Sequence, residues 1–322
     1  MKAVWLREGR LALRDVPEPV EAGGDAIVRV SLAGICNTDL ELVRGYYPMD
    51  GIPGHEFVGV VERAPSAPDW IGRRVVGEIN VVCGSCATCR AGRPRHCERR
   101  SVLGIRDRHG AFAERLALPI ANLHRVPDEV PDEAAVFSEP LAAALEVQEQ
   151  VKIERGQRVV VIGDGKLGQL VARVLVLTGC ELMVIGRHPG KLAALPAGIQ
   201  ALHVREDTLP AGRRADVVVE CTGNEGGLGL ALRLVRPRGC VVLKSTYRGE
   251  ARANMSAVVV DEISLLGSRC GPMAPALTLL ESGAVDVRNL VHARYPLADA
   301  LAAFDHSTQP GVLKVLLQAQ AR

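Results

Sequence analysis

The first part of the chain alternates short apolar runs with turn residues. Residues 26–30 and 57–61 are rich in valine and are bounded by Gly-Gly, Pro-Gly and Pro-Ser pairs, so each run predicts a short strand. Strands at this spacing are typical of a small β-barrel or sandwich. The segment 82–100 has no hydrophobic period and is rich in Gly, Cys and Arg. This predicts a loop that needs something other than a hydrophobic core to hold its structure.

From about residue 141 the pattern becomes an alternation of strands and helices. Continuous apolar runs, typical of strands buried on both faces, cover residues 158–162, 182–185, 216–220 and 240–243. Helical patterns cover residues 141–151, 167–177 and 227–234, and a helix and a closing strand are expected near 298–304 and 312–317. This alternation predicts a doubly wound parallel sheet.

A valine-rich run at Val258–Ile263 predicts a strand at the edge of that sheet. An exposed edge strand can pair with the same strand of a second copy. We therefore expect a homodimer, or a homotetramer built as a dimer of dimers.

Composition narrows the class of protein. The chain has 322 residues, of which 48% are hydrophobic and 24% charged, so we expect a globular protein of two domains. A net charge of +2 and an aromatic content of 3% argue against nucleic-acid and membrane-surface partners. The first eight residues lack a signal-peptide pattern, and there is no apolar window of 18 residues. A soluble, cytoplasmic protein is the expectation.

Four of the nine cysteines lie within fifteen residues in a Cys-x2-Cys-x2-Cys-x7-Cys pattern. They are Cys83, Cys86, Cys89 and Cys97. Four closely spaced thiolates supply the complete tetrahedral ligand set of a structural zinc ion, with no open coordination position. Free or redox-active thiols are one alternative, and an iron–sulfur cluster is another, because ferredoxins share the Cys-x2-Cys-x2-Cys part of this pattern.

Three other short segments carry side chains that bind metals. Cys36 lies in Gly-Ile-Cys-Asn-Thr-Asp, His55 in Pro-Gly-His-Glu, and Glu139 in Ser-Glu-Pro-Leu. Each is weak alone, because a lone cysteine is usually a packing residue. A catalytic zinc ion needs about three protein ligands and one open position for a substrate oxygen. One thiolate, one imidazole and one carboxylate together would supply these ligands.

A glycine-rich turn, Gly-Asp-Gly-Lys-Leu-Gly, follows the first buried strand and opens a helix. In this context the G-x-G-x-x-G pattern indicates a dinucleotide site, with the pyrophosphate at the helix N-terminus. The residues expected to bind the cofactor here are Gly163, Gly165, Lys166, Leu167 and Gly168. Asp164 is unfavourable beside a phosphate and is expected to point outward. A glycine set needed only for packing is the alternative.

The end of the second strand bears on the choice of dinucleotide. It reads Gly186-Arg187-His188, with Lys191 shortly after, and so offers no carboxylate for a ribose 2′-hydroxyl. A guanidinium binds a 2′-phosphate through paired hydrogen bonds, so we expect NADP to be preferred. In the alternative, Arg187 stacks on adenine and NAD binds.

Two later strands end in further polar residues. These are Thr222, Gly223, Ser245 and Thr246. Ligands bind outside the carboxyl ends of parallel strands, so we expect these residues to flank the nicotinamide half of the cofactor.

In their order and spacing, these motifs resemble the zinc-containing medium-chain dehydrogenase/reductase family, in its alcohol, polyol and threonine dehydrogenase branch. The resemblance covers nearly the whole chain. It implies an α/β protein with a GroES-like β-barrel catalytic domain, residues 1–140 completed by 288–322, and a Rossmann domain, residues 141–287.

The resemblance also implies two zinc ions per chain. Cys36, His55 and Glu139 match the ligands of the catalytic ion, and the four clustered cysteines match those of the structural ion. Glu56 matches an acid behind the catalytic metal that can become a transient ligand. Asp39 matches the carboxylate that orients the histidine ligand.

Three more roles follow from the resemblance. Thr38 matches the hydroxyl that hydrogen-bonds the substrate oxygen and relays its proton. Glu41 stands where many relatives carry a proton-relaying histidine, so the proton would leave through Glu41 or through water. Lys314 falls where relatives place a basic residue on the cofactor phosphates.

The implied activity is hydride transfer between a secondary alcohol or polyol, or the matching ketone or aldehyde, and NADP(H). One alternative is a cofactor-binding sensor that has the fold without catalysis. Another is a zinc-free quinone or enoyl reductase, which would not need Cys36, His55 and Glu139 together. Absorbance at 340 nm with a panel of alcohols and ketones separates an enzyme from a sensor.

Overall fold

The computed structural model describes residues 1–204 and 214–319, and the contacts divide them into two compact units. The first unit comprises residues 1–139 and 273–319, and the second comprises residues 140–272 outside 205–213. Residues 273–287 group with the first unit, whereas the sequence boundary placed them in the cofactor domain. Helix α9 (Met273–Glu281) contacts α3 (Asp132–Ala135) and buries four apolar side chains, which ties it to that unit.

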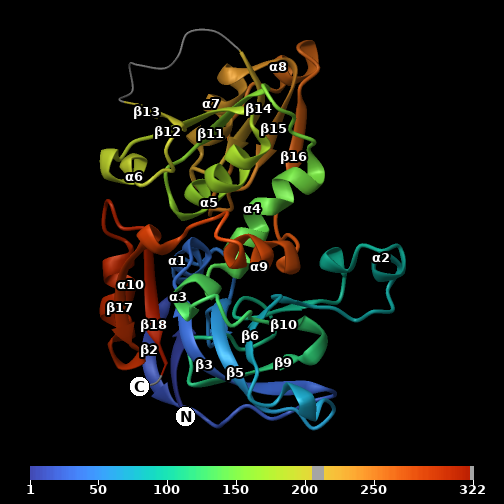
Figure 1. Cartoon of the computed structure of the whole chain (residues 1–322), viewed down its shortest axis with the longest axis vertical. Coiled ribbons are helices and arrows are strands. Elements are labelled where there is room, and N and C mark those ends of the chain that lie inside the picture. The colour runs from blue at the N-terminus through green and yellow to red at the C-terminus, as the bar shows by residue number, and fades with distance from the viewer. Residues whose placement is uncertain (205–213, 320–322) are drawn as a thin grey trace. The chain divides into compact units, whose positions relative to one another are not determined.

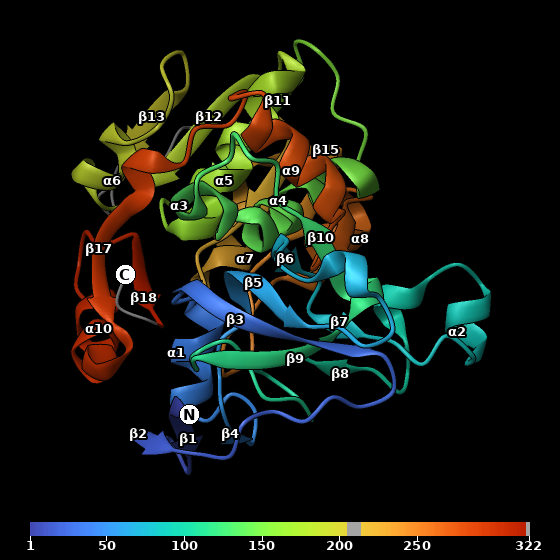
Figure 2. The same cartoon turned by 60° about the horizontal axis from the view of Figure 1, so that its bottom comes forward.

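The first unit is built on three sheets, the largest of which has seven strands and is antiparallel except for the parallel pair β17 and β18 (Figures 1 and 2). Its strands run β10 (Leu123–Arg125), β6 (Arg74–Gly77), β5 (Glu56–Arg63), β3 (Asp25–Gly34), β18 (Lys314–Gln318) and β17 (Val291–Pro296), with β9 (Arg115–Pro119) also on β3. The smaller sheets are β2 (Arg10–Asp15), β1 (Lys2–Arg7) and β4 (Asp50–Gly51), and β7 (Asn80–Val81) with β8 (Ser101–Val102). The predicted runs at 26–30 and 57–61 lie inside β3 and β5.

Strand register in this unit brings distant segments together. Gly34 in β3 lies opposite Glu56 in β5 on one side and opposite Leu316 in β18 on the other. The residues that follow β3, precede β5 and begin β18 are therefore neighbours. Helices α1 (Asn37–Val43) and α10 (Ala300–Ser307) also belong to this unit.

The second unit contains a six-stranded sheet in which every pair is parallel. Its order is β13 (Gln200–His203), β12 (Glu181–Gly186), β11 (Arg158–Ile162), β14 (Ala215–Glu220), β15 (Val235–Leu243) and β16 (Ser264–Gly267). The helices are α4 (Ser138–Gln150), which begins in the first unit, α5 (Lys166–Leu175), α6 (Pro189–Ala193), α7 (Gly226–Leu234) and α8 (Met255–Val260). This strand order is that of a doubly wound dinucleotide-binding sheet.

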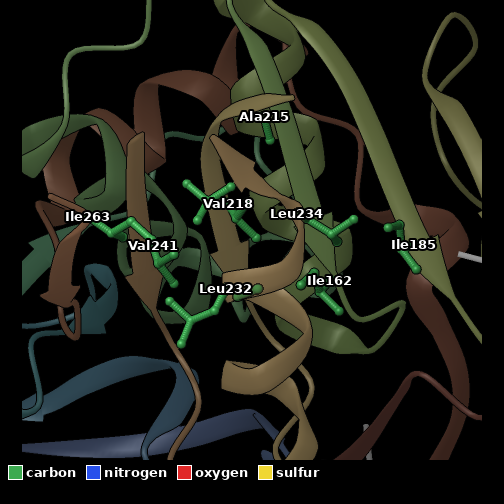
Figure 3. Packing of buried hydrophobic residues seen from close by; sticks show 10 residues of the cluster. Ile162, Ile185, Ala215, Val218, Leu232, Leu234, Val241 and Ile263 are labelled. Carbon is green, nitrogen blue, oxygen red and sulfur yellow. The ribbon is translucent and has the colours of Figure 1, made fainter. Parts of the chain in front are cut away.

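Aliphatic side chains fill the core of the second unit. Ile162, Ile185, Val218 and Val241 come from four different strands and pack with Leu232 and other apolar residues of α7 (Figure 3). Each such side chain contributes about 1.5 to 3 kcal/mol when fully buried. The alternation of buried strands and helices is therefore enough to hold the sheet without aromatic residues.

The predicted edge strand at Val258–Ile263 is wrong. Residues Met255–Val260 form helix α8, which begins after Asn254, whose side chain accepts a hydrogen bond from the Ser256 N–H at 3.1 Å. Val259 and Val260 are 76% and 79% exposed, so their β-branched shape is not used for strand packing. The N-cap stabilises the start of this helix, and β16 forms the edge of the sheet instead.

The segment 82–100 is a loop that contains the one-turn helix α2 (Ala87–Arg90). Across the two described ranges, we find no helix of the length and apolarity needed to cross a membrane.

Candidate functional site

Cys36, His55 and Glu56 come together in the first unit. Cys36 precedes α1 and follows β3, while His55 stands directly before β5 and Glu56 begins it. One ligand atom from each residue lies within 4.8 Å of those of the other two. His55 and Glu56 are buried, and Cys36 is half-buried. A thiolate, an imidazole and a carboxylate at this separation form a donor set that suits a zinc ion.

Asp39 lies behind two of these residues. Its Oδ2 atom accepts a hydrogen bond from the Cys36 N–H at 2.8 Å, and its Oδ1 atom lies 3.3 Å from His55 Nδ1. Burial by itself lowers the pKa of His55, but the charges of Asp39 and Cys36 raise it well above its usual value. A metal ion bound by the imidazole would displace the proton that this environment favours. The arrangement fits the predicted role of Asp39 in orienting the histidine.

Glu56 makes a buried ion pair with Lys314. The Lys314 ammonium donates a hydrogen bond to Glu56 Oε2, and both side chains are 1% exposed. Burial lowers the pKa of Lys314, yet the charges of Glu56 and Cys36 raise it above its usual value. Within the described residues, Glu56 Oε1 is buried without a hydrogen-bond partner. An unpartnered carboxylate oxygen beside Cys36 and His55 fits a place for a cation.

Lys314 thus lies on Glu56, whereas the resemblance assigned it to the cofactor phosphates; that cofactor role stays a prediction. The contact is also one that sequence analysis missed, because 258 positions separate the two residues. Gly34 was missed for the same reason. A Cβ atom at Gly34 would lie 2.5 Å from Glu56 Oε2 and 3.4 Å from Lys314 Cδ, so a side chain there would displace the Glu56 carboxylate from its present position.

The other residues predicted for this site are Glu139, Thr38 and Glu41. Glu139 is half-buried in the first turn of α4 and is not part of the close three-residue group. Thr38 Oγ1 lies 3.8 Å from Cys36 Sγ. Glu41 is buried, and its carboxylate pairs with Arg44 Nη1 at 2.7 Å.

The four clustered cysteines form a second candidate metal site. Their sulfur atoms lie within 4.8 Å of one another, and three Sγ–Sγ distances are 3.5, 3.5 and 3.8 Å. Tetrahedral zinc with Zn–S bonds of about 2.3 Å separates its ligands by roughly 3.8 Å, so the sulfurs fit the ion. Hydrogen bonds from the backbone at Ser85 and Cys86 lower the pKa of Cys83 to about 5, although burial opposes this shift. All nine cysteines are free thiols.

In the glycine turn of the second unit, one glycine has free space where a side chain would lie, and the other two have no such space. Gly163 has a φ of +115°, and its Cβ would lie 2.6 Å from the Cys221 carbonyl oxygen. At Gly168 a Cβ would lie 2.0 Å from the Gly163 carbonyl oxygen. At Gly165, which caps the N-terminus of α5, a Cβ would meet nothing within 4 Å. The free space at Gly165 lies at the N-terminus of α5, where backbone N–H groups lack partners within the helix, which fits a pyrophosphate.

The carboxylate of Asp164 lies against the end of β12, whereas the sequence analysis expected it to point outward. Asp164, expected to point outward, is 6% exposed and accepts a hydrogen bond from the His188 N–H at 2.7 Å. Its Oδ1 atom lies 3.1 Å from His188 Nδ1. The interpretation that this strand end has no carboxylate is therefore corrected. Arg187 is exposed, and Lys191 is half-buried, with a pKa that burial lowers and the charge of Asp164 raises.

The remaining predicted cofactor residues follow β14 and β15 or lie at the start of α5. The Thr222 N–H donates a hydrogen bond to Glu220 Oε1 at 2.6 Å, and the Gly223 N–H donates to Ser245 Oγ at 2.8 Å. Thr246 is exposed. Lys166 and Leu167 are half-buried in the first turn of α5. The hydrogen bond between Gly223 and Ser245 links the ends of two adjacent strands, as expected for one binding edge.

Comparison with known families gives two matches along the chain. Residues 22–128 match the model of the alcohol dehydrogenase GroES-like domain. Residues 167–282 match the model of the zinc-binding dehydrogenase family. The first match contains Cys36, His55 and the four clustered cysteines.

Individual relatives match over nearly their whole length. A sorbitol dehydrogenase from Halalkalibacterium halodurans is 30% identical, with 96% of each chain covered. An L-threonine 3-dehydrogenase from Streptomyces avermitilis is 32% identical, again with 96% of each chain covered. Among solved structures, an alcohol dehydrogenase from Thermus sp. ATN1 has a TM-score of 0.89 at 31% identity, covering 99% of this chain and 100% of that one. A zinc-binding dehydrogenase from Sinorhizobium meliloti, bound to NADP, has a TM-score of 0.88 at 28% identity, covering 98% of both.

Proposed function

Because the chain belongs to the zinc-type medium-chain dehydrogenase family, whose members include NAD(P)-dependent alcohol dehydrogenases, we propose that it transfers hydride between a secondary alcohol or polyol and NADP(H). The observation that carries the proposal is the close group of Cys36, His55 and Glu56. A zinc-free reductase on this scaffold would have no use for that group. The relatives act on sorbitol and L-threonine by name, which supports a small hydroxyl-bearing substrate.

Cys36, His55 and Glu139 would hold the catalytic zinc ion, with Glu56 as the acid behind it. When bound, the ion acts as a Lewis acid that lowers the pKa of a substrate hydroxyl. The four clustered cysteines would hold a structural zinc ion, which gives two ions per chain. Because the four thiolates complete a tetrahedron, that second site has no position for substrate.

The side chains around the first site have separate tasks. Asp39 contacts both the backbone of Cys36 and the ring of His55, so it fixes the orientation of two ligands at once. Thr38 lies beside Cys36 and would accept the proton of the substrate hydroxyl. Glu41 already pairs with Arg44, so a proton would pass to solvent through this pair or through water.

The second unit would bind the dinucleotide. Gly165 leaves room for the pyrophosphate at the N-terminus of α5, with Gly163, Lys166, Leu167 and Gly168 around it. Thr222, Gly223, Ser245 and Thr246 would flank the nicotinamide half. The cofactor supplies the hydride chemistry, and the chain supplies position. Gly186, Arg187, His188 and Lys191 form the turn that would meet the 2′-phosphate, and the exposed guanidinium supports a preference for NADP.

A homodimer or homotetramer is part of this proposal. β16 stands at the edge of the six-stranded sheet, and the exposed Val259 and Val260 lie on the neighbouring helix α8. An unpaired strand edge beside exposed apolar side chains favours pairing with a second copy. Light scattering on the purified protein measures the assembly directly.

The test is turnover of a panel of alcohols, polyols, amino alcohols and ketones, followed at 340 nm with NAD(H) and NADP(H). Zinc-replete protein is expected to turn over at least one substrate pair and to contain about two zinc ions per chain. Cys36→Ser is expected to lose activity and about one zinc ion, while Cys180→Ser, a thiol outside both clusters, retains both. Full zinc content without turnover of any substrate would instead favour a cofactor-binding sensor.

A further inference from the structure

The carboxylate at the end of β12 comes from the glycine turn and not from the strand itself. Asp164 follows β11, and its Oδ2 atom accepts a hydrogen bond from the His188 N–H at 2.7 Å, just beyond the last residue of β12. The His188 ring lies against the same carboxylate, at 3.1 and 3.2 Å from its two oxygens. These contacts join the turn after β11 to the turn after β12.

Gly186 makes this placement sterically feasible. A Cβ atom at Gly186 would lie 2.5 Å from Asp164 Oδ2 and 2.6 Å from Asp164 Cβ. The Asp164 side chain therefore fills the volume that a side chain on the last residue of β12 would occupy. An acid at Gly186 and an acid at Asp164 cannot both be present without a shift of one of them.

In doubly wound dinucleotide folds, an acid about 20 residues after the glycine turn accepts a hydrogen bond from the ribose 2′-hydroxyl. Here that position is glycine, and the Asp164 carboxylate lies over it. A carboxylate has about four acceptor sites, and the His188 N–H and ring account for at most three contacts. The side chain is 8% exposed, so part of it remains accessible.

The same turn also carries positive charge. Arg187 is exposed, and burial lowers the pKa of Lys191 below its usual value, although the charge of nearby Asp164 opposes this shift. A guanidinium attracts a 2′-phosphate, whereas a carboxylate repels one and accepts from a 2′-hydroxyl instead. The two charges therefore act in opposite directions on the same choice.

We infer that Asp164 is a specificity-determining residue that favours the 2′-hydroxyl of NAD and limits the preference for NADP that Arg187 creates. The inference rests on the proposed function, because it requires a dinucleotide at this turn. Asp164 does not replace Arg187 but opposes it. The ratio of the two cofactor affinities is then a balance that a single charge can move.

The test measures dissociation constants for NAD⁺ and NADP⁺ by titration calorimetry, without substrate. Asp164→Asn keeps the shape and can still accept the His188 N–H, but it removes the negative charge. The preference for NADP⁺ over NAD⁺ is expected to rise by about 10-fold or more, as a lost charged hydrogen bond and a relieved repulsion predict.

Asp216→Asn is the matched control. Asp216 also accepts a backbone N–H, from Arg158 at 2.8 Å, and also pairs with a cationic side chain, Arg236. It stands at the start of β14, opposite to the carboxyl ends of the strands. The same change of charge there is expected to leave the affinity ratio unchanged.

Moving the carboxylate from position 164 to position 186 separates the effect of its charge on cofactor binding from any effect on folding. Asp164→Gly empties the space above Gly186 and should raise the NADP⁺ preference, as Asp164→Asn does. Asp164→Gly combined with Gly186→Asp moves the acid onto the strand and should return the ratio toward that of the unaltered protein. An unchanged ratio in Asp164→Asn, with both dinucleotides still bound, overturns the inference and leaves Asp164 as a structural cap. Binding of neither dinucleotide to the unaltered protein overturns the proposed function as well.

Discussion

Lys314 and Glu56 form an ion pair in which each side chain is 1% exposed, although 258 positions separate them in the chain. Strand register produces the contact, because β3 lies between β5 and β18 and carries glycine where the two side chains meet. A buried charge without its partner is costly, so each residue depends on the other. The pair links the candidate metal site to the strand that closes the first unit.

Replacing Lys314 by methionine is expected to destabilise the protein by about 3 to 5 kcal/mol, because the Glu56 carboxylate stays buried without its cation. Denaturant unfolding measures the loss. The double variant Lys314→Met with Glu56→Gln is expected to lose less than Lys314→Met alone, since no unpaired charge remains. If the loss of stability in the double variant equalled the sum of the losses in the two single variants, the two side chains would not be coupled.

Gly34→Ala tests the close approach beside this pair. Its Cβ would lie 2.5 Å from Glu56 Oε2, so the carboxylate must move, at a cost of about 1 to 3 kcal/mol and with weaker zinc retention. Gly267→Ala is the control, because a Cβ there meets nothing within 4 Å and Gly267 also lies in a strand. Equal thermal stability of the two variants would contradict the prediction.

Two glycines of the dinucleotide turn should respond differently to the same change. Gly165→Ala adds a methyl group to open space, so we expect a loss of at most about 1 kcal/mol from the weaker N-cap, but a dissociation constant for the dinucleotide that rises by about 10-fold or more. Gly168→Ala places a Cβ 2.0 Å from a backbone oxygen, and we expect a loss of at least about 3 kcal/mol. Thermal melts with and without NADP⁺ distinguish the two effects.

Cys97→Ser removes one of the four clustered sulfurs. Zinc content measured by atomic absorption is expected to fall from about two ions per chain to about one, because three thiolates leave the structural tetrahedron incomplete. Limited proteolysis should then cut within residues 83–97, which depend on the ion for their fold. Cys240→Ser, outside the cluster, should change neither result.

Asp216 provides a pH dependence of stability. Burial raises its pKa, but hydrogen bonds from Arg236 and Arg158 lower it more, so the folded pKa lies below the ordinary value. As the pH falls, Asp216 therefore takes up a proton in the unfolded chain before it does so in the folded protein. Its contribution to the stability of the fold is complete above about pH 4 and is lost as the pH falls through the folded pKa. Urea unfolding of the protein and of Asp216→Asn between pH 3 and pH 7 should give curves that converge at the acid end. Parallel curves would contradict the assignment.

Local patterns were enough to predict much of the fold. The buried strand β11 has the bounds that its apolar run indicates, and the glycine turn and the cysteine spacing act within a few neighbouring residues. The fold class that the resemblance implied, a GroES-like domain with a Rossmann domain, is confirmed by the family matches and the parallel sheet.

Long-range contacts limited the prediction of the site. Neither the contact of Lys314 with Glu56 nor the close approach of both to Gly34 has a local signal, because strand register brings these residues together. Asp164 was misjudged since its direction depends on a glycine in another strand. Helix α8 was misjudged because Val259 and Val260 are exposed on a capped helix, where the packing that gives valine its strand preference is absent.

The order in which the polypeptide is made gives the Glu56–Lys314 pair a temporal consequence. Translation at about 5 to 20 residues per second separates the emergence of these residues from the ribosome by roughly 13 to 50 seconds. Until β18 arrives, the acid beside Cys36 and His55 has no ammonium to neutralise it and remains hydrated. The ion pair beside Cys36 and His55 therefore forms only after β18, the last strand of the described residues, has been made.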